Sequence, residues 1–384
     1  IDQHQQPRYL AVSAAAVLTS LPFARRIHQN LPSLSINSKV ATAVAIAATA
    51  GGGLLIALLG RRLLNDCRRR RRLRAALNAK RAERRRAKAE FGAYLASQTM
   101  SDAEEAEIAA LTARQLVAAL RDGRLGQDRV LLAYQRRAYR ADQSLNCVAE
   151  FLHPDLSEVN LAGPLKGLPV SVKENFVMAG RDACVGCSVF VGQPAEADCL
   201  PVRQIKALGG VPFVRTVVPQ TMLSVLSSNP IDGTVLNPAN RSRCPGGSSS
   251  GEGALIAAGG SPLGLGTDIG GSVRTPAAWC GVASLKVTGG RLSRLGMRGT
   301  GPQRLVEPAW GPMAPDVDSL ALLLECLLEP PMPLPAELTD PTVPPMALEL
   351  EAAMAVEAKM TIGYMVSNGQ LRAAPCMERA VLLA

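Results

Sequence analysis

GGSSSGEG (Gly246–Gly253) and DIGGSVR (Asp268–Arg274) are two glycine-rich segments that contain serine and stand close together in the sequence. The glycine-rich loop of a P-loop nucleotide-binding protein carries a Lys-Ser/Thr pair after its last glycine. The first segment lacks that pair, and Glu252 would place a negative charge against a phosphate. The two segments therefore indicate serine chemistry rather than nucleotide binding.

A serine nucleophile needs a neighbouring base. The chain contains three histidines, His4, His28 and His153. The first two precede a long uncharged stretch, so a Ser-His-Asp triad would depend on His153. Lys173 is an alternative base because it ends a short apolar strand, where an ammonium group is hard to hydrate. A lysine acts as a base only when it is neutral, which requires its pKa to fall by roughly 3 units from about 10.4.

The residues around these segments alternate between helical and strand patterns. Helices are predicted over 101–123, 201–210 and 317–328, and strands over 167–173 and 211–217. Such alternation indicates an α/β fold in which helices cover a sheet. Catalytic residues are then expected in the loops at the ends of the strands.

Three stretches, GLPVSVKENF (167–176), ALGGVPFVRTVVPQTMLSVLSSNP (207–230) and CPGGSSSGEGALIAAGGSPLGLGTDIGGS (244–272), resemble the amidase signature family. The resemblance extends from about Thr112 to the C-terminus and is greatest to the fatty-acid amide hydrolase branch of the family. It implies an amidase signature fold, with a mixed central sheet covered by helices. It also implies hydrolysis of a lipid amide without a metal or organic cofactor, and it favours a homodimer.

The resemblance implies a Ser-Ser-Lys triad. Ser272 corresponds to the nucleophile, Ser248 to the serine that relays a proton, and Lys173 to the base. Asp268 and Arg274 flank the nucleophile and are expected to hold the shape of its loop. One glycine-rich segment would thus present the attacking oxygen and the other the relay.

Two further groups of site residues are expected. The oxyanion is expected to be bound by four backbone N–H groups, those of Ile269, Gly270, Gly271 and Ser272, because glycines let the chain turn without side chains in the way. By the resemblance, Met222 and Ser224 lie near the acyl site and contact the substrate. Ser250 stands where related sequences commonly have glycine, which would strain the loop if the position needs a positive φ.

A stretch of twenty residues without a charge, VATAVAIAATAGGGLLIALL, occupies residues 40–59. This length allows a helix to cross a bilayer core of roughly 30 Å. A transmembrane helix is therefore predicted over 40–60, with a buried helix of a soluble domain as the alternative. The basic residues that follow would place the catalytic part in the cytosol, on an intracellular membrane crossed once. Residues 1–39, with an apolar run at 9–23, form a leader that we leave unassigned.

The positive charge of the chain is concentrated in one segment. The net charge is +10, and residues 61–90 contain fourteen Lys or Arg against three Asp or Glu, a local balance of +11. Residues 61–92 are predicted to form a juxtamembrane helix near anionic lipid headgroups. An RNA-binding arm is disfavoured because residues 61–90 contain no aromatic side chain for base stacking, so no nucleic-acid partner is expected.

The nine cysteines are an odd number in a chain of this length, which indicates reduced thiols rather than a disulfide framework. Cys184 and Cys187 form a CxxC pair, but no second pair completes a zinc site. We therefore expect these two thiols to be packed in the interior.

Residues 93–384 are predicted to form the amidase domain, incomplete at its C-terminal end because domains of this family normally continue further. Three functional hypotheses follow. The chain is a membrane-anchored serine amidase that cleaves fatty-acid amides to a fatty acid and an amine. Alternatively, it is an amidase or amidotransferase subunit for small polar amides. In the third hypothesis it is an inactive, truncated homologue that associates with membranes or partners.

Overall fold

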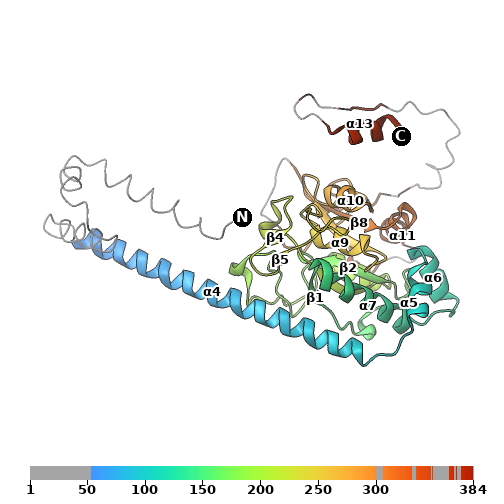
Figure 1. The fold of residues 1–384 in the computed structure, drawn as a ribbon, viewed down its shortest axis with the longest axis horizontal. Coiled ribbons are helices and arrows are strands. Elements are labelled where there is room, and N and C mark those ends of the chain that lie inside the picture. Colours follow the sequence, from blue (N-terminus) through green and yellow to red (C-terminus); the bar gives the residue numbers. More distant parts are fainter. Residues whose placement is uncertain are drawn as a thin grey trace. The chain divides into compact units, whose positions relative to one another are not determined.

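The structure is a computed structural model that describes residues 53–299, 306–330, 334–346, 348, 363–366, 369 and 373–383 (Figure 1). It separates into two compact units, Ile1–Ala75 and Ala76–Ala384. The larger unit contains the sheet and all the expected catalytic residues.

The described helices are α4 (Gly53–Ala96), α5 (Asp102–Ala109), α6 (Ala113–Arg121), α7 (Gln127–Leu145), α8 (Leu200–Ala207), α9 (Ser250–Ala257), α10 (Arg274–Cys280), α11 (Val317–Leu328) and α13 (Pro375–Leu383). The described strands are β1 (Val148–Phe151), β2 (Pro169–Lys173), β3 (Val211–Thr216), β4 (Ser228–Asn229), β5 (Gly233–Thr234), β6 (Gly264–Asp268), β7 (Ala283–Ser284) and β8 (Ala309–Ala314).

The central sheet has six strands in the order β1-β3-β2-β6-β8-β7. The inner strands β3, β2 and β6 are parallel. β1 pairs antiparallel with β3, while β8 pairs antiparallel with both β6 and β7. This arrangement confirms the expected α/β fold with a mixed central sheet.

The parallel strands bring two loops to the same edge of the sheet. β2 ends at Lys173 and β6 ends at Asp268, immediately before the segment that carries Ser272. Because parallel strands run in the same direction, their carboxyl ends meet at one edge, which is where open α/β sheets bind ligands. The strand order therefore places the lysine beside the nucleophile loop.

Helix α9 connects the loop that carries Ser248 to the sheet. It contacts β2, β3, β6 and β8, and its residues from Ser250 to Ile256 are all buried (Figure 1). Gly251 permits this close packing, because a Cβ there would lie 2.3 Å from the carbonyl oxygen of Cys147 and 2.5 Å from the backbone nitrogen of Val217. A larger residue at this position would push α9 away from β3.

The single helix predicted over 101–123 is two helices, α5 and α6. The break occurs at Thr112, whose side chain accepts a hydrogen bond from the Gln115 backbone N–H while the Gln115 side chain accepts one from the Thr112 N–H. This capping box satisfies N–H groups at the start of α6. The capping residues therefore begin a second helix, although the helical pattern of the sequence is continuous.

The C-terminal part of α4, residues 76–96, belongs to the larger unit and packs on the rest of that unit through one face. Lys80, Arg84 and Lys88 recur every fourth residue and are followed on the same face by buried Phe91 and Leu95. The three cations form ion pairs with carboxylates from separate segments: Lys80 with Asp182, Arg84 with Glu174 and Asp232, and Lys88 with Asp142. The domain boundary at 92/93 stays a prediction, and the two compact units of the structure divide at 75/76.

The N-terminal predictions fall largely outside the described residues. These include the unassigned leader over 1–39 and residues 40–52 of the predicted transmembrane helix. Within the described part of the chain, no helix has the length and apolar character needed to cross a membrane. In the smaller unit, the arginines of residues 61–74 are exposed.

Candidate active site

Lys173 is the last residue of β2 and has no exposed surface. Its Nζ lies 2.8 Å from Ser248 Oγ, and it donates hydrogen bonds to the carbonyl oxygen of Thr267 at 3.2 Å and to Thr267 Oγ1 at 2.8 Å. A neutral amine has two N–H donors and one lone pair. When both donors are taken by Thr267, the lone pair faces Ser248.

Burial favours this neutral form. Loss of water around Nζ lowers the pKa of Lys173 to about 7, although the negative charges of Asp268 and Glu252 favour the ammonium form. The pKa shift of roughly 3 units that a lysine base requires is therefore present.

Ser248 lies in the loop that leads into α9 and is 2% exposed. Gly246 before it has φ 86°, in the region that favours glycine. A Cβ at Gly247 would lie 2.5 Å from the carbonyl oxygen of Ser224, so the loop packs tightly against the neighbouring backbone. The Gly247–Ser248 peptide bond is cis. The close packing of the loop at Gly247 fixes the position of Ser248 relative to Lys173.

Ser272 follows β6 and its loop is held by Asp268. The Asp268 carboxylate accepts hydrogen bonds from the backbone N–H groups of Gly271 and Val273, and it pairs with Arg274 at 2.9 Å. These donors lower the pKa of Asp268 to about 2. Asp268 and Arg274 thus shape the loop, as expected, although Asp268 also lines the cavity beside Ser272.

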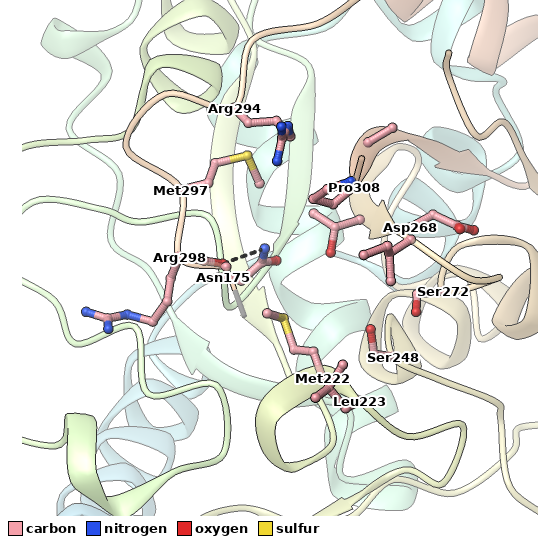
Figure 2. A pocket seen from close by; sticks show the side chains of 14 residues that line it. Asn175, Met222, Leu223, Ser248, Asp268, Ser272, Arg294, Met297, Arg298 and Pro308 are labelled. Carbon is pink, nitrogen blue, oxygen red and sulfur yellow. Dashed lines mark hydrogen bonds between the residues drawn. The ribbon is translucent and has the colours of Figure 1, made fainter. Parts of the chain in front are cut away.

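The two serine loops are joined directly. The Ser249 N–H donates to the carbonyl oxygen of Ser272 at 3.0 Å. Figure 2 shows the hydroxyl groups of Ser248 and Ser272 next to each other and facing the same cavity. Ser248 thus contacts Lys173 and lines the same cavity as Ser272.

The backbone N–H groups of the loop that carries Ser272 differ in their hydrogen-bond partners. That of Gly271 donates to Asp268 Oδ1 at 2.8 Å. Among the described residues, the N–H groups of Ile269, Gly270 and Ser272 donate no hydrogen bond. These three donors remain available to an oxyanion, whereas the Gly271 donor is shared with the aspartate in this arrangement.

The cavity beside Ser272 has a volume of about 90 Å³. Its lining residues are Asn175, Met222, Leu223, Ser248, Thr267, Asp268, Ile269, Ser272, Arg294, Met297, Arg298, Gly299, Pro308 and Ala309. Met222 lines this cavity (Figure 2), and its contact with a substrate stays a prediction. Ser224 is not part of this lining, and its Oγ accepts a hydrogen bond from the Leu226 N–H instead.

Two further residues, Ser250 and His153, bear on the alternatives considered above. Ser250 begins α9 without a positive φ, so the anticipated strain is not present. His153 contacts the rings of Phe91 and Tyr94, with centroid distances of 5.2 and 5.1 Å, and does not line the cavity of Ser272. The lysine-based arrangement is therefore the one that the geometry supports.

All nine cysteines have free thiols, as predicted, and Cys184 and Cys187 are both buried. Half-buried Thr267 and fully buried Glu252 were not identified as site residues from the sequence. A threonine in a strand and a glutamate in a glycine-rich segment carry no local signal of a contact with Lys173 or its strand.

Comparisons with known proteins agree with this geometry. Residues 129–384 match the family model described as Amidase. The chain is 45% identical over 285 residues to fatty-acid amide hydrolase 1 of Sus scrofa, covering 73% of this chain and 48% of that protein. It is 40% identical to the vitamin D3 hydroxylase-associated protein of Gallus gallus, covering 72% of this chain and 60% of that protein.

A solved structure of a fatty acid amide hydrolase superposes with a TM-score of 0.68 at 27% identity. The superposition covers 80% of this chain and 59% of the other. The chain thus spans about half to three-fifths of the length of these relatives.

Proposed function

The chain belongs to the amidase family, and we propose that it is a serine amidase that hydrolyses a carboxamide through an acyl-enzyme on Ser272. The observation that supports the proposal is the contact of buried Lys173 with Ser248. Ser248 in turn lines the same cavity as Ser272. Lys173 is the base and Ser248 is the relay. Neither the chemistry nor the geometry calls for a cofactor in this reaction.

The acylation step moves one proton from the nucleophile to the base. Ser272 Oγ attacks the amide carbon while its proton passes to Ser248 Oγ, and the Ser248 proton passes to Lys173 Nζ. The carbonyl oxygen becomes an oxyanion and accepts hydrogen bonds from the N–H groups of Ile269, Gly270 and Ser272. The C–N bond then breaks as the proton returns from Lys173 through Ser248 to the leaving nitrogen.

Deacylation uses the same route. Water attacks the ester carbonyl of the acyl-enzyme and loses a proton through Ser248 to Lys173. The ester C–O bond breaks, Ser272 Oγ takes the proton back, and the carboxylic acid leaves. The relay matters because an amine is a poor leaving group unless its nitrogen is protonated.

We assign a fatty-acid amide as the substrate class. The assignment is supported by the similarity to two fatty-acid amide hydrolases and by the apolar side chains of Met222, Leu223 and Met297 around the cavity. A second candidate, a small polar amide, is favoured by the cavity volume of about 90 Å³, well below the roughly 300–1,000 Å³ of pockets that enclose whole ligands.

The proposal includes attachment to a membrane. The uncharged stretch at 40–59 and the exposed arginines of residues 61–74 support a helix that spans an intracellular membrane, with a basic flank on the cytosolic side. A substrate with a long acyl chain partitions into the bilayer, so such an anchor would hold the enzyme near its substrate.

The deciding experiment is labelling of the 384-residue chain with a fluorophosphonate probe, followed by mass mapping of the modified serine. We expect modification at Ser272, and no modification in Ser272→Ala. Absence of labelling in a chain that is folded by circular dichroism would contradict the proposal. A series of amides with acyl chains of 2 to about 18 carbons then separates the two substrate classes, because a fatty-acid amidase shows kcat/KM rising with chain length.

A further inference from the structure

Glu252 is a fully buried carboxyl group that lies close to the catalytic lysine. It is on α9, four residues after Ser248, and has no exposed surface. Its Oε2 accepts a hydrogen bond from Ser171 Oγ at 2.6 Å, and its Oε1 accepts one from Thr216 Oγ1 at 2.7 Å. Both of its oxygens are therefore held by hydroxyl groups from the sheet.

The two hydroxyl donors are tied to the position of Lys173. Ser171 lies two residues before Lys173 on β2, so the two side chains point to the same face of the sheet. Thr216 on β3 is the register partner of Lys173. The Glu252 carboxyl group thus contacts the face of the sheet from which the lysine side chain projects.

The third strand, β6, leaves room for this carboxyl group. A Cβ at Gly264 would lie 2.2 Å from Glu252 Oε2 and 2.7 Å from Ser171 Oγ. A glycine is therefore required where β6 passes the carboxyl group, and β2, β3 and β6 together form a closed site for it.

The elements that pack against α9 carry charged and titratable groups, which include Arg137 and Asp142 of α7, Cys147 before β1, Lys173 of β2, Arg215 of β3, Asp268 of β6, and Arg274 and Cys280 of α10. Most of them have partners elsewhere: Arg137 with Glu105, Asp142 with Lys88, Arg215 with Glu150, and Asp268 with Arg274. Of these cations, only Lys173 lacks a carboxylate in ion-pair contact, and Glu252 has no ion-pair partner within the described residues.

We propose that Glu252 is a positioning residue that supplies the counter-charge for Lys173 when the lysine holds the proton taken from Ser272. In the proposed reaction, Lys173 alternates between amine and ammonium while remaining buried. An unpaired buried ammonium is costly, so a fixed negative charge nearby stabilises the intermediate state. The negative charge of Asp268 also favours the ammonium form of Lys173, and does so more strongly than that of Glu252. Its carboxylate is already engaged by Arg274 and two backbone N–H groups, whereas Glu252 has no cationic partner among the described residues.

The acid-base properties of the two groups agree with this role. Burial raises the pKa of Glu252 to about 7, and burial lowers the pKa of Lys173 to about 7, while each group favours the charged form of the other. Near neutral pH the pair is therefore poised between a neutral and an ionised state, and its two titrations are coupled.

The test is Glu252→Gln, which keeps the shape of the side chain but removes its charge. Because a negative charge favours the ammonium form, its removal lowers the pKa of Lys173. We expect the midpoint of the pH dependence of Ser272 labelling to fall by about one pH unit, with at least a ~10-fold lower kcat. A purely structural role would lower the amount of active protein without moving the midpoint.

Glu105→Gln is the matched control, because Glu105 is also buried but pairs with arginines of α7. It should lower stability and leave the midpoint unchanged. If Glu252→Gln does not fold, Ser171→Ala provides the test: loss of one donor makes Glu252 hold its proton more readily, so the midpoint still falls, by a smaller amount. An unchanged midpoint in the folded variant would overturn the proposal.

The inference depends on the proposed function, so the experiment includes a readout that needs no turnover. The ¹³Cε resonance of Lys173, in lysine-labelled chain and assigned by its loss in Lys173→Ala, reports the lysine titration directly. A midpoint that falls in Glu252→Gln, in a chain that does not label at Ser272, would refute the serine amidase function alone. Labelling at Ser272 with the same lysine midpoint in both proteins would refute the role of Glu252 alone.

Discussion

Arg84 of α4 forms a buried ion pair with Glu174, the residue that directly follows Lys173. Its second nitrogen pairs with Asp232, in the turn between β4 and β5. The C-terminal half of α4, a helix rich in basic residues, thus holds the end of β2. The ion pair links the position of α4 to that of Lys173.

Arg84→Met should destabilise the protein by about 3–5 kcal/mol, because it leaves the Glu174 and Asp232 carboxylates without their shared cation. Chemical denaturation followed by circular dichroism measures the change. The matched control is Arg86→Met on the same helix, where Arg86 and its partner Glu90 are 73% and 71% exposed. That variant should remain within about 0.5 kcal/mol of the parent protein. Equal effects would contradict the buried role of Arg84.

The rate of Ser272 labelling should rise with pH through a midpoint near 7. Lys173 has a pKa lowered to about 7, and only its neutral form accepts a proton, so activity is lost as the pH falls through this value. The rate of labelling, measured between pH 5 and 11 with protein folding checked at each pH, gives the midpoint. A midpoint near 10 would mean that Lys173 behaves as an ordinary exposed lysine.

Thr267→Val should lower kcat by roughly 10- to 100-fold, with little change in KM. The substitution keeps the shape of the side chain but removes one of the two acceptors that orient the Lys173 amine. Ser261→Ala is a suitable control because its buried hydroxyl group donates to Leu263 O, a contact within the turn before β6. A comparable loss of kcat in both variants would indicate general destabilisation rather than misorientation of the lysine.

Gly251→Ala should destabilise the protein by about 1–3 kcal/mol, because the added methyl group meets the backbone of Cys147 and Val217. Gly270→Ala is the comparison within the neighbouring loop, since a Cβ there meets nothing within 4 Å and the residue has no positive φ. It should unfold at nearly the parent temperature. Thermal denaturation of both variants measures the change in stability. A Gly251→Ala protein that is more stable than the parent would contradict the observed packing.

Ile46→Arg combined with Thr49→Arg should release the chain from membranes into the supernatant during alkaline carbonate extraction. Each arginine raises the cost of inserting the centre of a spanning helix by roughly 2.5–3.5 kcal/mol. Ile46→Leu, which keeps the stretch apolar, should remain in the membrane fraction with the parent. Release of the parent chain itself would rule out the membrane span that we propose.

Much of the site could be predicted from local sequence. Glycines around Ser248 and Ser272 indicated turns that present serines, and the apolar residues before Lys173 indicated a strand that buries it. These signals are readable because turn and strand preferences depend on neighbouring residues. The division of residues 101–123 into two helices was also encoded locally, in the capping residues Thr112 and Gln115, although the continuous helical pattern concealed it.

The sequence by itself determined the family, the alternation of helices and strands, and the identity of the three residues of the proposed triad. Only the tertiary structure decided which groups surround Lys173. Thr267 and Glu252 lie 94 and 79 positions further along the chain, on β6 and α9, and no local pattern connects them to the lysine. The partners of Lys80, Arg84 and Lys88 could not be predicted from the sequence either. A run of basic residues indicates a helix that faces solvent or lipid unless the acidic residues that it contacts are known. The physical reason is that the pKa of a buried group and the partner of a charge depend on distances between atoms, and the packing of the sheet sets those distances.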